Sequence, residues 1–246
     1  MPRVSIITPT KNRQAFLPAL WECVRNQSFN NIEWLIHDGS PQPAPMFAGI
    51  KDSRVRYMHT PQPMSIGAKR NDLCRAAKGE IIVHFDDDDF YGPHYVQNMI
   101  KFMTDQKADF VKLFGFFLYH QQHNALAYWD LEIDLPLHFI LRPNNPPFPH
   151  PNKGHMSGLW GYGFSYVFRR TVWDAVSFPD RNHGEDEPFA DAARQNFKAA
   201  GMRDFDHTCI HVIHANNTAV TYPQQLLPPQ LLPGLFPDFR KGQGST

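Results

Sequence analysis

Four consecutive aspartates, Asp86, Asp87, Asp88 and Asp89, follow the apolar run 81–85 and are the residues of this chain best suited to chemistry. Carboxylates this close together repel one another unless a cation neutralises them. Hard oxygen ligands suit Mg²⁺ or Mn²⁺, which complete their coordination with water and substrate phosphates. A solvated acidic turn is the alternative. The position of this acidic run, after a buried strand and before Gly92-Pro93 as a helix start, favours a metal site.

A second acidic group, Glu185-Asp186-Glu187, opens a helix predicted over 185–200. A carboxylate held there could take a proton from a hydroxyl, although acidic residues in a first helical turn also simply complement the helix dipole. His214, just after a strand predicted at 209–213, could bind a metal or a phosphate, or be a structural histidine. His211 would lie on the opposite strand face and is less suited to that role.

Length and composition exclude several classes of protein. The 246 residues, 42% of them hydrophobic, can bury one substantial core, and 24 basic residues balance 24 acidic ones. This balance favours neither a nucleic acid nor an anionic membrane as partner. Three scattered cysteines without a CxxC spacing indicate a reducing compartment. No apolar stretch approaches the ~20 residues of a membrane span, and no signal peptide is evident, so we expect a cytoplasmic protein without a transmembrane segment.

The elements that must position these residues alternate between strand and helix in the first half of the chain, which predicts an α/β fold with a Rossmann-like, mostly parallel central sheet flanked by helices. We expect one domain over 1–221, with halves 1–105 and 106–221, and a Pro-rich extension over 222–246. The predicted strands are 4–7, 32–36, 54–58, 81–85, 110–119, 162–168 and 209–213. The predicted helices are 16–24, 65–78, 93–103 and 185–200, the last stopped by Gly201.

Two segments are rich in proline. Residues 136–153 hold six prolines and are predicted to be a structureless loop, which we expect to act as an acceptor-side lid. The extension 222–246 is predicted to be an extended arm packed on the body, and a pair of such arms could form a homodimer contact.

Three predicted strands end in polar residues, at the edge where parallel sheets bind ligands. These residues are Thr8-Pro9-Thr10, Asp38-Gly39-Ser40 and the acidic run. With motifs in the same order elsewhere, they resemble the inverting family 2 glycosyltransferases of the GT-A fold. The segments that carry the resemblance are 4–13, 26–29, Glu33, 37–40, 68–71, 76–80, the Asp-x-Asp of the acidic run, Gly184-Glu185-Asp186 and 214–218.

The sequence also departs from the family pattern. His37 stands where the family has the first of two aspartates, which leaves Asp38 as the expected base contact. The Gln-x-x-Arg-Trp motif of the processive polysaccharide synthases does not occur, so transfer of a single sugar is expected.

The resemblance implies a nucleotide pocket. Its expected lining is Thr8, Pro9, Thr10, Asp38, Arg70, Asp86 and Asp87. Asp38 would accept a hydrogen bond from a uracil N–H, with an Asx turn as the alternative. Arg70 would reach the base or the diphosphate, whereas Lys69 is expected to stay at the surface. Asp86 would contact the ribose or a metal-bound water.

The resemblance also assigns the metal and the chemistry. Asp88 would bind Mn²⁺ or Mg²⁺ with His214 as a further ligand, and Asp89 would orient nearby backbone or cap the helix near Pro93. Asp186 would be the general base and Glu185 would bind the acceptor. Trp160 would belong to the floor under the donor sugar and the acceptor, although core packing explains such a ring equally well.

We therefore expect a metal-dependent, inverting glycosyltransferase that moves one sugar from a nucleotide-sugar, with UDP as the expected nucleotide, to a carbohydrate, lipid-linked or protein hydroxyl. A sugar nucleotidyltransferase would want a Gly-rich phosphate loop after the first strand, and residues 8–13 contain no glycine. A nucleotide-sugar-binding module without catalysis and a divalent-cation phosphohydrolase are two further candidates. Glu185-Asp186 argues against the binding module.

Overall fold

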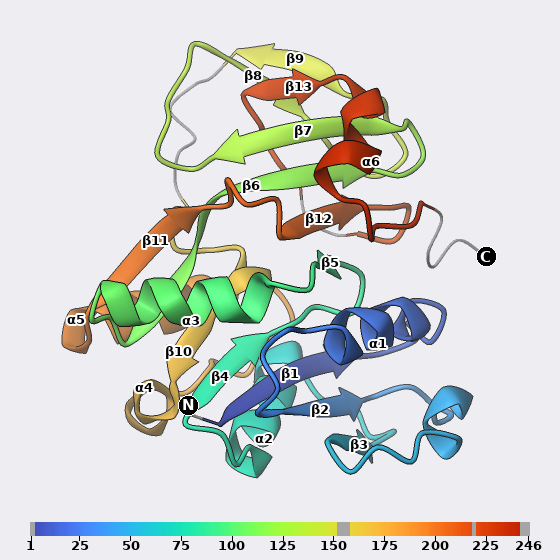
Figure 1. Cartoon of the computed structure of the whole chain (residues 1–246), viewed down its shortest axis with the longest axis vertical. Coiled ribbons are helices and arrows are strands. Elements are labelled where there is room, and N and C mark those ends of the chain that lie inside the picture. The colour runs from blue at the N-terminus through green and yellow to red at the C-terminus, as the bar shows by residue number, and fades with distance from the viewer. Residues whose placement is uncertain (1–2, 152–157, 218–219, 242–246) are drawn as a thin grey trace.

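The computed structural model describes residues 3–151, 158–217 and 220–241, which build a mixed eleven-stranded sheet with helices on both faces (Figure 1). The strands are β1 Val4–Thr10, β2 Ile32–Asp38, β3 Val55–His59, β4 Ile81–His84, β5 Phe90–Tyr91, β6 Phe110–His120, β7 Ala125–Asp130, β8 Leu137–Ile140, β9 Phe148–Pro151, β10 Val167–Arg169, β11 Ala199–Arg203, β12 Cys209–Ile213 and β13 Gln225–Leu227, of which β8 and β9 form a separate two-stranded sheet. The helices are α1 Leu17–Arg25, α2 Ile66–Ala76, α3 Tyr95–Asp105, α4 Arg170–Ala175, α5 Asp186–Asn196 and α6 Leu232–Leu235, with 3₁₀ turns η1 Pro45–Ala48, η2 Gly163–Ser165 and η3 Pro229–Leu231.

The first half of the sheet is parallel, as predicted, in the order β4-β1-β2-β3. Thr10 lies beside Asp38 in the β1–β2 register, and Ile7 lies beside His84 in the β1–β4 register. Successive residues of a strand face opposite sides of the sheet, so Ile6 packs with α1 on one face, and Ile7 packs with α2 on the other. The carboxyl ends of these strands therefore meet at one edge, where the acidic run follows β4.

The second half makes the sheet mixed. β10 lies antiparallel between β4 and β6, while β11 and β12 pair with β6 in parallel. β6 is buried along its whole length, because α3, α5 and their neighbouring strands cover it. This arrangement brings the start of α5 and His211 of β12 to the same edge as the acidic run.

The prediction that residues 136–153 are structureless is wrong for the part that the structure describes. β8 and β9 form a hairpin in which Leu137 pairs with Pro151 and Phe139 with Pro149. Proline is tolerated here because each strand of a two-stranded sheet has a free edge that needs no N–H donor. The N–H of Phe139 donates to the carbonyl of Pro223 at 2.8 Å, which ties the hairpin to the C-terminal segment. Residues 152 and 153 lie outside the described residues.

Two further predicted boundaries are wrong. The helix expected over 185–200 ends at Asn196, and Gly201 lies inside β11 instead of stopping a helix. A Cβ at Gly201 would lie 2.1 Å from the ring of Phe114, so the position admits no side chain without displacement of that ring. The strand expected over 162–168 is the turn η2 followed by the short β10, and Tyr162 before η2 has a left-handed φ of 61°.

The C-terminal segment packs on the body, as expected, but it is not a simple extended arm. β13 extends the sheet beside β7, and the one-turn helix α6 follows despite the prolines. Phe236 lies with its ring centroid 5.2 Å from that of Phe117 and 6.2 Å from that of Phe90. The apolar side chains of the segment thus serve the core of this chain, and the homodimer contact stays a prediction.

Candidate active site

Two adjoining cavities open at the carboxyl ends of the parallel strands. The strand-end cavity, of about 270 Å³, is lined by Pro9, Thr10, Lys11, Arg13, Ile66, Lys69, Arg70, Asp86, Asp87, Asp88, His211 and Asn217. The helix-side cavity, of about 530 Å³, is lined by Ile66, Arg70, Asp86, Gly158, Gly161, Tyr162, Gly163, Phe164, Asn182, His183, Gly184, Glu185, Asp186, Glu187, His211 and Val220. Ile66, Arg70, Asp86 and His211 line both, so the two cavities form one continuous site.

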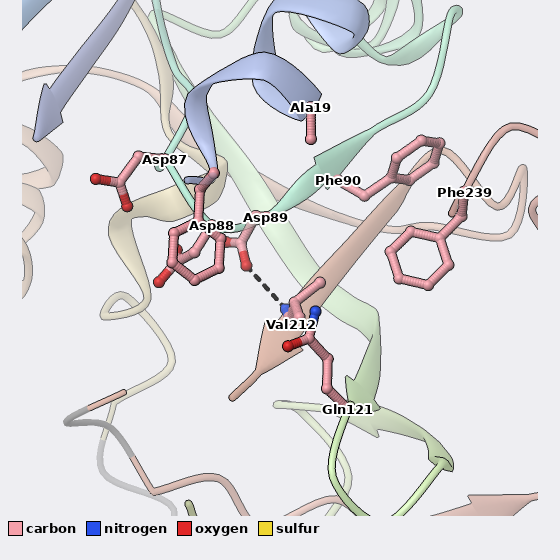
Figure 2. Close-up of a pocket in the computed structure, with 9 residues that line it drawn as sticks. Ala19, Asp87, Asp88, Asp89, Phe90, Gln121, Val212 and Phe239 are labelled. Carbon is pink, nitrogen blue, oxygen red and sulfur yellow. Dashed lines mark hydrogen bonds between the residues drawn. The ribbon is translucent and has the colours of Figure 1, made fainter. Parts of the chain in front are cut away.

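Each aspartate of the acidic run has a different partner. The hydroxyl of Thr10 donates to Asp87 at 2.6 Å, and Nε2 of His214 lies 2.9 Å from Oδ2 of Asp88. Asp89 accepts hydrogen bonds from Nδ1 of His211 at 3.0 Å and from the backbone N–H of Val212 at 2.8 Å. Figure 2 shows Asp87 turned away from Asp89, whose carboxylate reaches across to β12.

Asp89 therefore does not cap the helix near Pro93, which was one of its two expected roles. α3 begins at Tyr95 with His94 as its N-cap residue. Asp89 instead orients the backbone of β12, which is distant in sequence, by its bond to Val212.

Burial and neighbouring charges separate the pKa values of these carboxyl groups. Burial raises the pKa of Asp86 to about 7 and raises that of Asp87 well above its usual value. Burial would also raise the pKa of Asp88, but the hydrogen bond from His214 and the charge of Arg13 lower it to about 2. The group could not carry its full negative charge in this buried site without further cations.

The arrangement fits a divalent cation that takes part of its ligands from a substrate. Asp88 and His214 offer an oxygen and a nitrogen side by side, and the guanidinium of Arg13 contacts both as a stand-in cation. Within the described residues, no three His, Cys, Asp or Glu side chains converge as a complete metal-binding group. Two protein ligands supplemented by phosphate and water are the usual case for Mg²⁺.

Of the residues expected to hold the nucleotide base, only some line the strand-end cavity. Pro9 and Thr10 line the strand-end cavity, whereas Thr8 is fully buried and donates to the carbonyl of Phe85 at 2.8 Å. Asp38 accepts hydrogen bonds from the N–H of Ser40 at 2.8 Å and from the hydroxyl of Tyr57 at 2.6 Å. The Asx turn is therefore present at Asp38, and its contact with a base stays a prediction.

The prediction that Lys69 is a surface residue is wrong. Lys69 is buried, and its Nζ donates to the carbonyl of Thr10 at 2.7 Å, where it braces the end of β1. Gly39 makes the room, because a Cβ there would lie 2.7 Å from this Nζ. Arg70 is buried as well and joins the two cavities: it donates to Glu185 at 2.7 Å and to Asp86 at 3.2 Å.

Asp186 is held by two backbone N–H groups. Gly163 donates to its Oδ2 and Glu187 to its Oδ1, each at 2.9 Å. Gly163 is fixed in turn because Nδ1 of His84 donates to its carbonyl at 2.8 Å. A Cβ on Gly163 would lie 2.9 Å from both Asp186 Cβ and Arg70 Nη1, so only glycine allows this close approach. The carboxylate is thereby aimed at the helix-side cavity, which it lines.

The structure places Trp160 away from the cavity linings, where it packs with the rings of Phe110 and Phe114 at centroid distances of 5.8 and 5.0 Å. Gly161, Tyr162 and Gly163 line the helix-side cavity instead. A role of Trp160 toward substrate stays a prediction.

Sequence reasoning missed Lys112. This fully buried lysine donates from Nζ to the carbonyl of Leu159 at 2.7 Å and to that of Gly161, and so holds the segment that lines the helix-side cavity. Burial lowers the pKa of Lys112 to about 7. A lysine within the apolar run 110–119 is the signal that could have found it.

Sequence reasoning also missed Arg13 and undervalued His211. His211 lines both cavities, and although burial alone would lower its pKa, the charge of Asp89 and its hydrogen bond raise the pKa of His211 to about 9. Strand alternation does not separate it from His214, because β12 ends at Ile213 and alternation no longer applies beyond that residue.

A sheet with this order and an acidic run at the ends of its parallel strands is the architecture of the GT-A class of glycosyltransferases. The chain belongs to glycosyl transferase family 2, whose model matches residues 5–169. It is 27% identical to EpsH of Bacillus subtilis over 236 residues, which cover 92% of this chain and 65% of EpsH.

Two solved structures share the fold. TarS 1-349 of S. aureus in complex with UDP-GlcNAc has a TM-score of 0.61 and 15% identity, with 85% of this chain and 58% of that chain covered. The mannosyltransferase PcManGT of Pyrobaculum calidifontis in complex with GDP-Man and Mn²⁺ has a TM-score of 0.60 and 16% identity, with 85% of this chain and 56% of that chain covered. The chain thus spans less than two thirds of the length of each of these three proteins. Among the described residues, no helix has the length and apolar character needed to cross a membrane.

Proposed function

We propose that this chain is a nucleotide-sugar-dependent glycosyltransferase that moves a single sugar from a UDP-sugar to an acceptor hydroxyl, with a divalent cation and with inversion. The observation that carries the proposal is the continuous site formed by the two cavities. The strand-end cavity combines acidic residues with Lys11, Arg13 and Arg70, a mixture suited to a metal and a diphosphate. The adjoining helix-side cavity presents the carboxylate of Asp186.

The strand-end cavity would hold the donor. Pro9 and Thr10 would line the nucleoside, and Arg70 would contact the diphosphate from between the two cavities. Asp88 and His214 would hold Mn²⁺ or Mg²⁺, which when bound offsets the negative charge on the departing nucleoside diphosphate. The binding of GDP-Man and Mn²⁺ by PcManGT and of UDP-GlcNAc by TarS supports this assignment for the fold, and leaves UDP as a proposal for this chain.

The helix-side cavity would hold the acceptor. Asp186 would accept the proton of an acceptor hydroxyl as that oxygen bonds to the anomeric carbon, while the bond from that carbon to the diphosphate breaks on the opposite face. Attack opposite the leaving group inverts the anomeric configuration. Glu185, which already binds Arg70, would position acceptor hydroxyls and keep Arg70 against Asp86.

The acceptor would be a carbohydrate, lipid-linked or protein hydroxyl. A cytosolic location remains part of the proposal, and it rests on Cys23, Cys74 and Cys209, which are buried and free.

The decisive experiment measures donor binding and product together. UDP with Mn²⁺ should raise the melting temperature by more than the two separate shifts combined, because each ligand supplies contacts that the other lacks. Asp88→Ala should abolish this synergy, whereas Asp105→Ala, which removes an exposed aspartate of α3, should preserve it. Purely additive shifts in the wild type would contradict the proposal.

A panel of UDP-, GDP- and dTDP-sugars, scored by nucleotide release with and without Mn²⁺, would identify the donor. Transfer should give a glycoside of inverted anomeric configuration by NMR. Free sugar or phosphate without glycoside would indicate a phosphohydrolase, and a sugar nucleotide formed from nucleoside triphosphate would indicate a nucleotidyltransferase. Tight UDP binding without turnover in any pair would indicate a binding module.

A further inference from the structure

The guanidinium of Arg13 contacts Asp88 and His214, the two residues that would hold a metal. Its Nη1 forms an ion pair with Asp88, lies 3.8 Å from Oδ1 of Asp87 and lies 3.0 Å from Nε2 of His214. Its Nη2 donates to the carbonyl of Asn216 at 3.2 Å. The side chain of Arg13 is 23% exposed, so it is mostly enclosed by these partners.

The hydrogen-bond chemistry of this cluster is crowded with donors. The N–H of Asn216 donates to Nδ1 of His214 at 3.2 Å, so the proton of the neutral imidazole lies on Nε2, from which it donates to Asp88. The Nη1 of Arg13 is also a donor, since guanidinium has no acceptor. Two donors, 3.0 Å apart, therefore share one oxygen of Asp88. This arrangement neutralises the charge of Asp88, but it places two hydrogen-bond donors against each other.

We propose that Arg13 is an exchangeable counter-ion, which neutralises Asp87 and Asp88 in the ligand-free protein and moves to the donor diphosphate when a divalent cation binds at Asp88. This inference rests on the proposed function. Arg13 and a divalent cation repel each other and compete for the same carboxylate oxygen, so both cannot hold it. Arg13 lines the strand-end cavity, and guanidinium binds phosphate through parallel N–H bonds.

The exchange predicts how metal and nucleotide depend on each other. A metal that binds alone must break the contacts of Arg13 with Asp88 and Asn216 without providing a new partner for the guanidinium. A metal that binds with a nucleoside diphosphate provides that partner in the same cavity. Arg13 thus acts as a positioning residue that makes metal binding depend on the donor.

The test is the affinity of the nucleotide-free protein for Mn²⁺, measured by electron paramagnetic resonance of free Mn²⁺. Arg13→Gln keeps a hydrogen-bonding side chain but removes the competing charge, so the affinity for Mn²⁺ alone should rise at least tenfold. The factor by which UDP tightens Mn²⁺ binding should fall by a similar amount. Unchanged or weaker Mn²⁺ binding by Arg13→Gln would overturn the inference.

Lys11→Gln is the matched control, because Lys11 is an exposed cation that lines the same cavity. Within the described part of the chain it forms no ion pair with the acidic run. The loss of its charge should change Mn²⁺ affinity much less than Arg13→Gln does. An equal rise in both variants would mean a general field effect, and would also overturn the exchange.

A second measurement covers a variant that folds poorly. Arg13→Gln should lower the melting temperature without ligands, and Mn²⁺ alone should restore it, whereas Mn²⁺ alone should shift the melting temperature of the wild type little.

If Arg13→Gln does not fold, Arg13→Lys takes its place, because it keeps the charge but loses the contact to Asn216. Arg13→Lys should show a smaller rise in Mn²⁺ affinity, and no rise would overturn the inference. If the wild type transfers sugar and binds UDP and Mn²⁺ with synergy, but substitution of Arg13 leaves Mn²⁺ affinity unchanged, the exchange alone is refuted. A wild type that binds neither ligand would refute the proposed function as well.

Discussion

Replacement of Asp186 by asparagine tests the proposed base, and the structure shows that this change does more than remove a charge. Both carboxylate oxygens of Asp186 accept a backbone N–H, from Gly163 and from Glu187, each at 2.9 Å. An asparagine amide has one acceptor oxygen, so one of these two backbone N–H groups would face the amide NH₂, which is itself a donor. The lost bond should lower the free energy of unfolding by about 0.5–1.5 kcal/mol, because the N–H of Glu187 is exposed to water. The loss of the proton acceptor should lower kcat by roughly 10²–10⁴-fold.

Gly163→Ala separates the chemistry of Asp186 from its position. The added Cβ would lie 2.9 Å from Asp186 Cβ, and that atom, close to the backbone of α5, has little room to move away. A displacement of about 1 Å at a reacting group costs on the order of 10²-fold in rate. Gly163→Ala should therefore lower kcat although the carboxylate is retained, whereas Asp186→Asn removes the proton acceptor itself.

The assay is kcat for the wild type, Asp186→Asn and Gly163→Ala, with the anomeric configuration of the product determined by NMR. A wild-type product that retains the donor configuration would refute a base on the far face, whatever the variants do. Asp186→Asn with kcat within a few-fold of the wild type would also refute it. If Glu187→Gln is instead the inactive variant, the base lies one residue further along and the mechanism survives.

Two other predictions concern stability. Burial lowers the folded-state pKa of Lys112 to about 7, below the unfolded value of about 10.4, so the unfolded chain binds more protons between these pH values. In urea unfolding, the free energy of unfolding of the wild type should therefore rise relative to that of Lys112→Met by roughly 1 kcal/mol per pH unit from about pH 7 to 10. A difference between the two proteins that does not depend on pH would contradict this. Gly201→Ala would bring a Cβ to 2.1 Å from the ring of Phe114. This overpacking should lower the free energy of unfolding by about 1–3 kcal/mol in the same assay. An unchanged unfolding midpoint would show that the ring moves aside freely, against the prediction.

The parallel half of the fold is predictable because its signals are local. The strands 4–7, 32–36 and 81–85 are short apolar runs that end in polar turns, and they are confirmed as β1, β2 and β4, although β4 ends one residue early at His84. Ser65 caps α2 as expected, since its hydroxyl accepts from Ala68 N–H at 3.0 Å. Once the strands are known to be parallel, the acidic run must share an edge with Thr10.

The elements that sequence reasoning missed depend on partners distant in sequence. β11 forms at residues with weak strand signals because β6 offers a free edge to pair with, and tertiary pairing outweighs local propensity there. Lys69 and Lys112 are buried only because carbonyl groups from other segments meet their ammonium groups. No pattern near Lys69 shows where its carbonyl partner lies, so residue type alone assigns it to the surface, whereas Lys112 is marked only by the apolar run around it.

One strand links the two halves of the site. Asp86, two residues after the end of β4, binds Arg70 beside the strand-end cavity, while His84, the last residue of β4, donates to the carbonyl of Gly163. Gly163 in turn donates to Asp186, so the proposed donor side and the proposed base are connected through β4 by three hydrogen bonds, of which that of His84 is buried and the other two are partly buried. The separation between the diphosphate position and the base is therefore set by the backbone of β4. A general base must act at a fixed distance from the atom under attack, and a strand buried in the middle of the sheet is the part of this fold least able to let that distance vary.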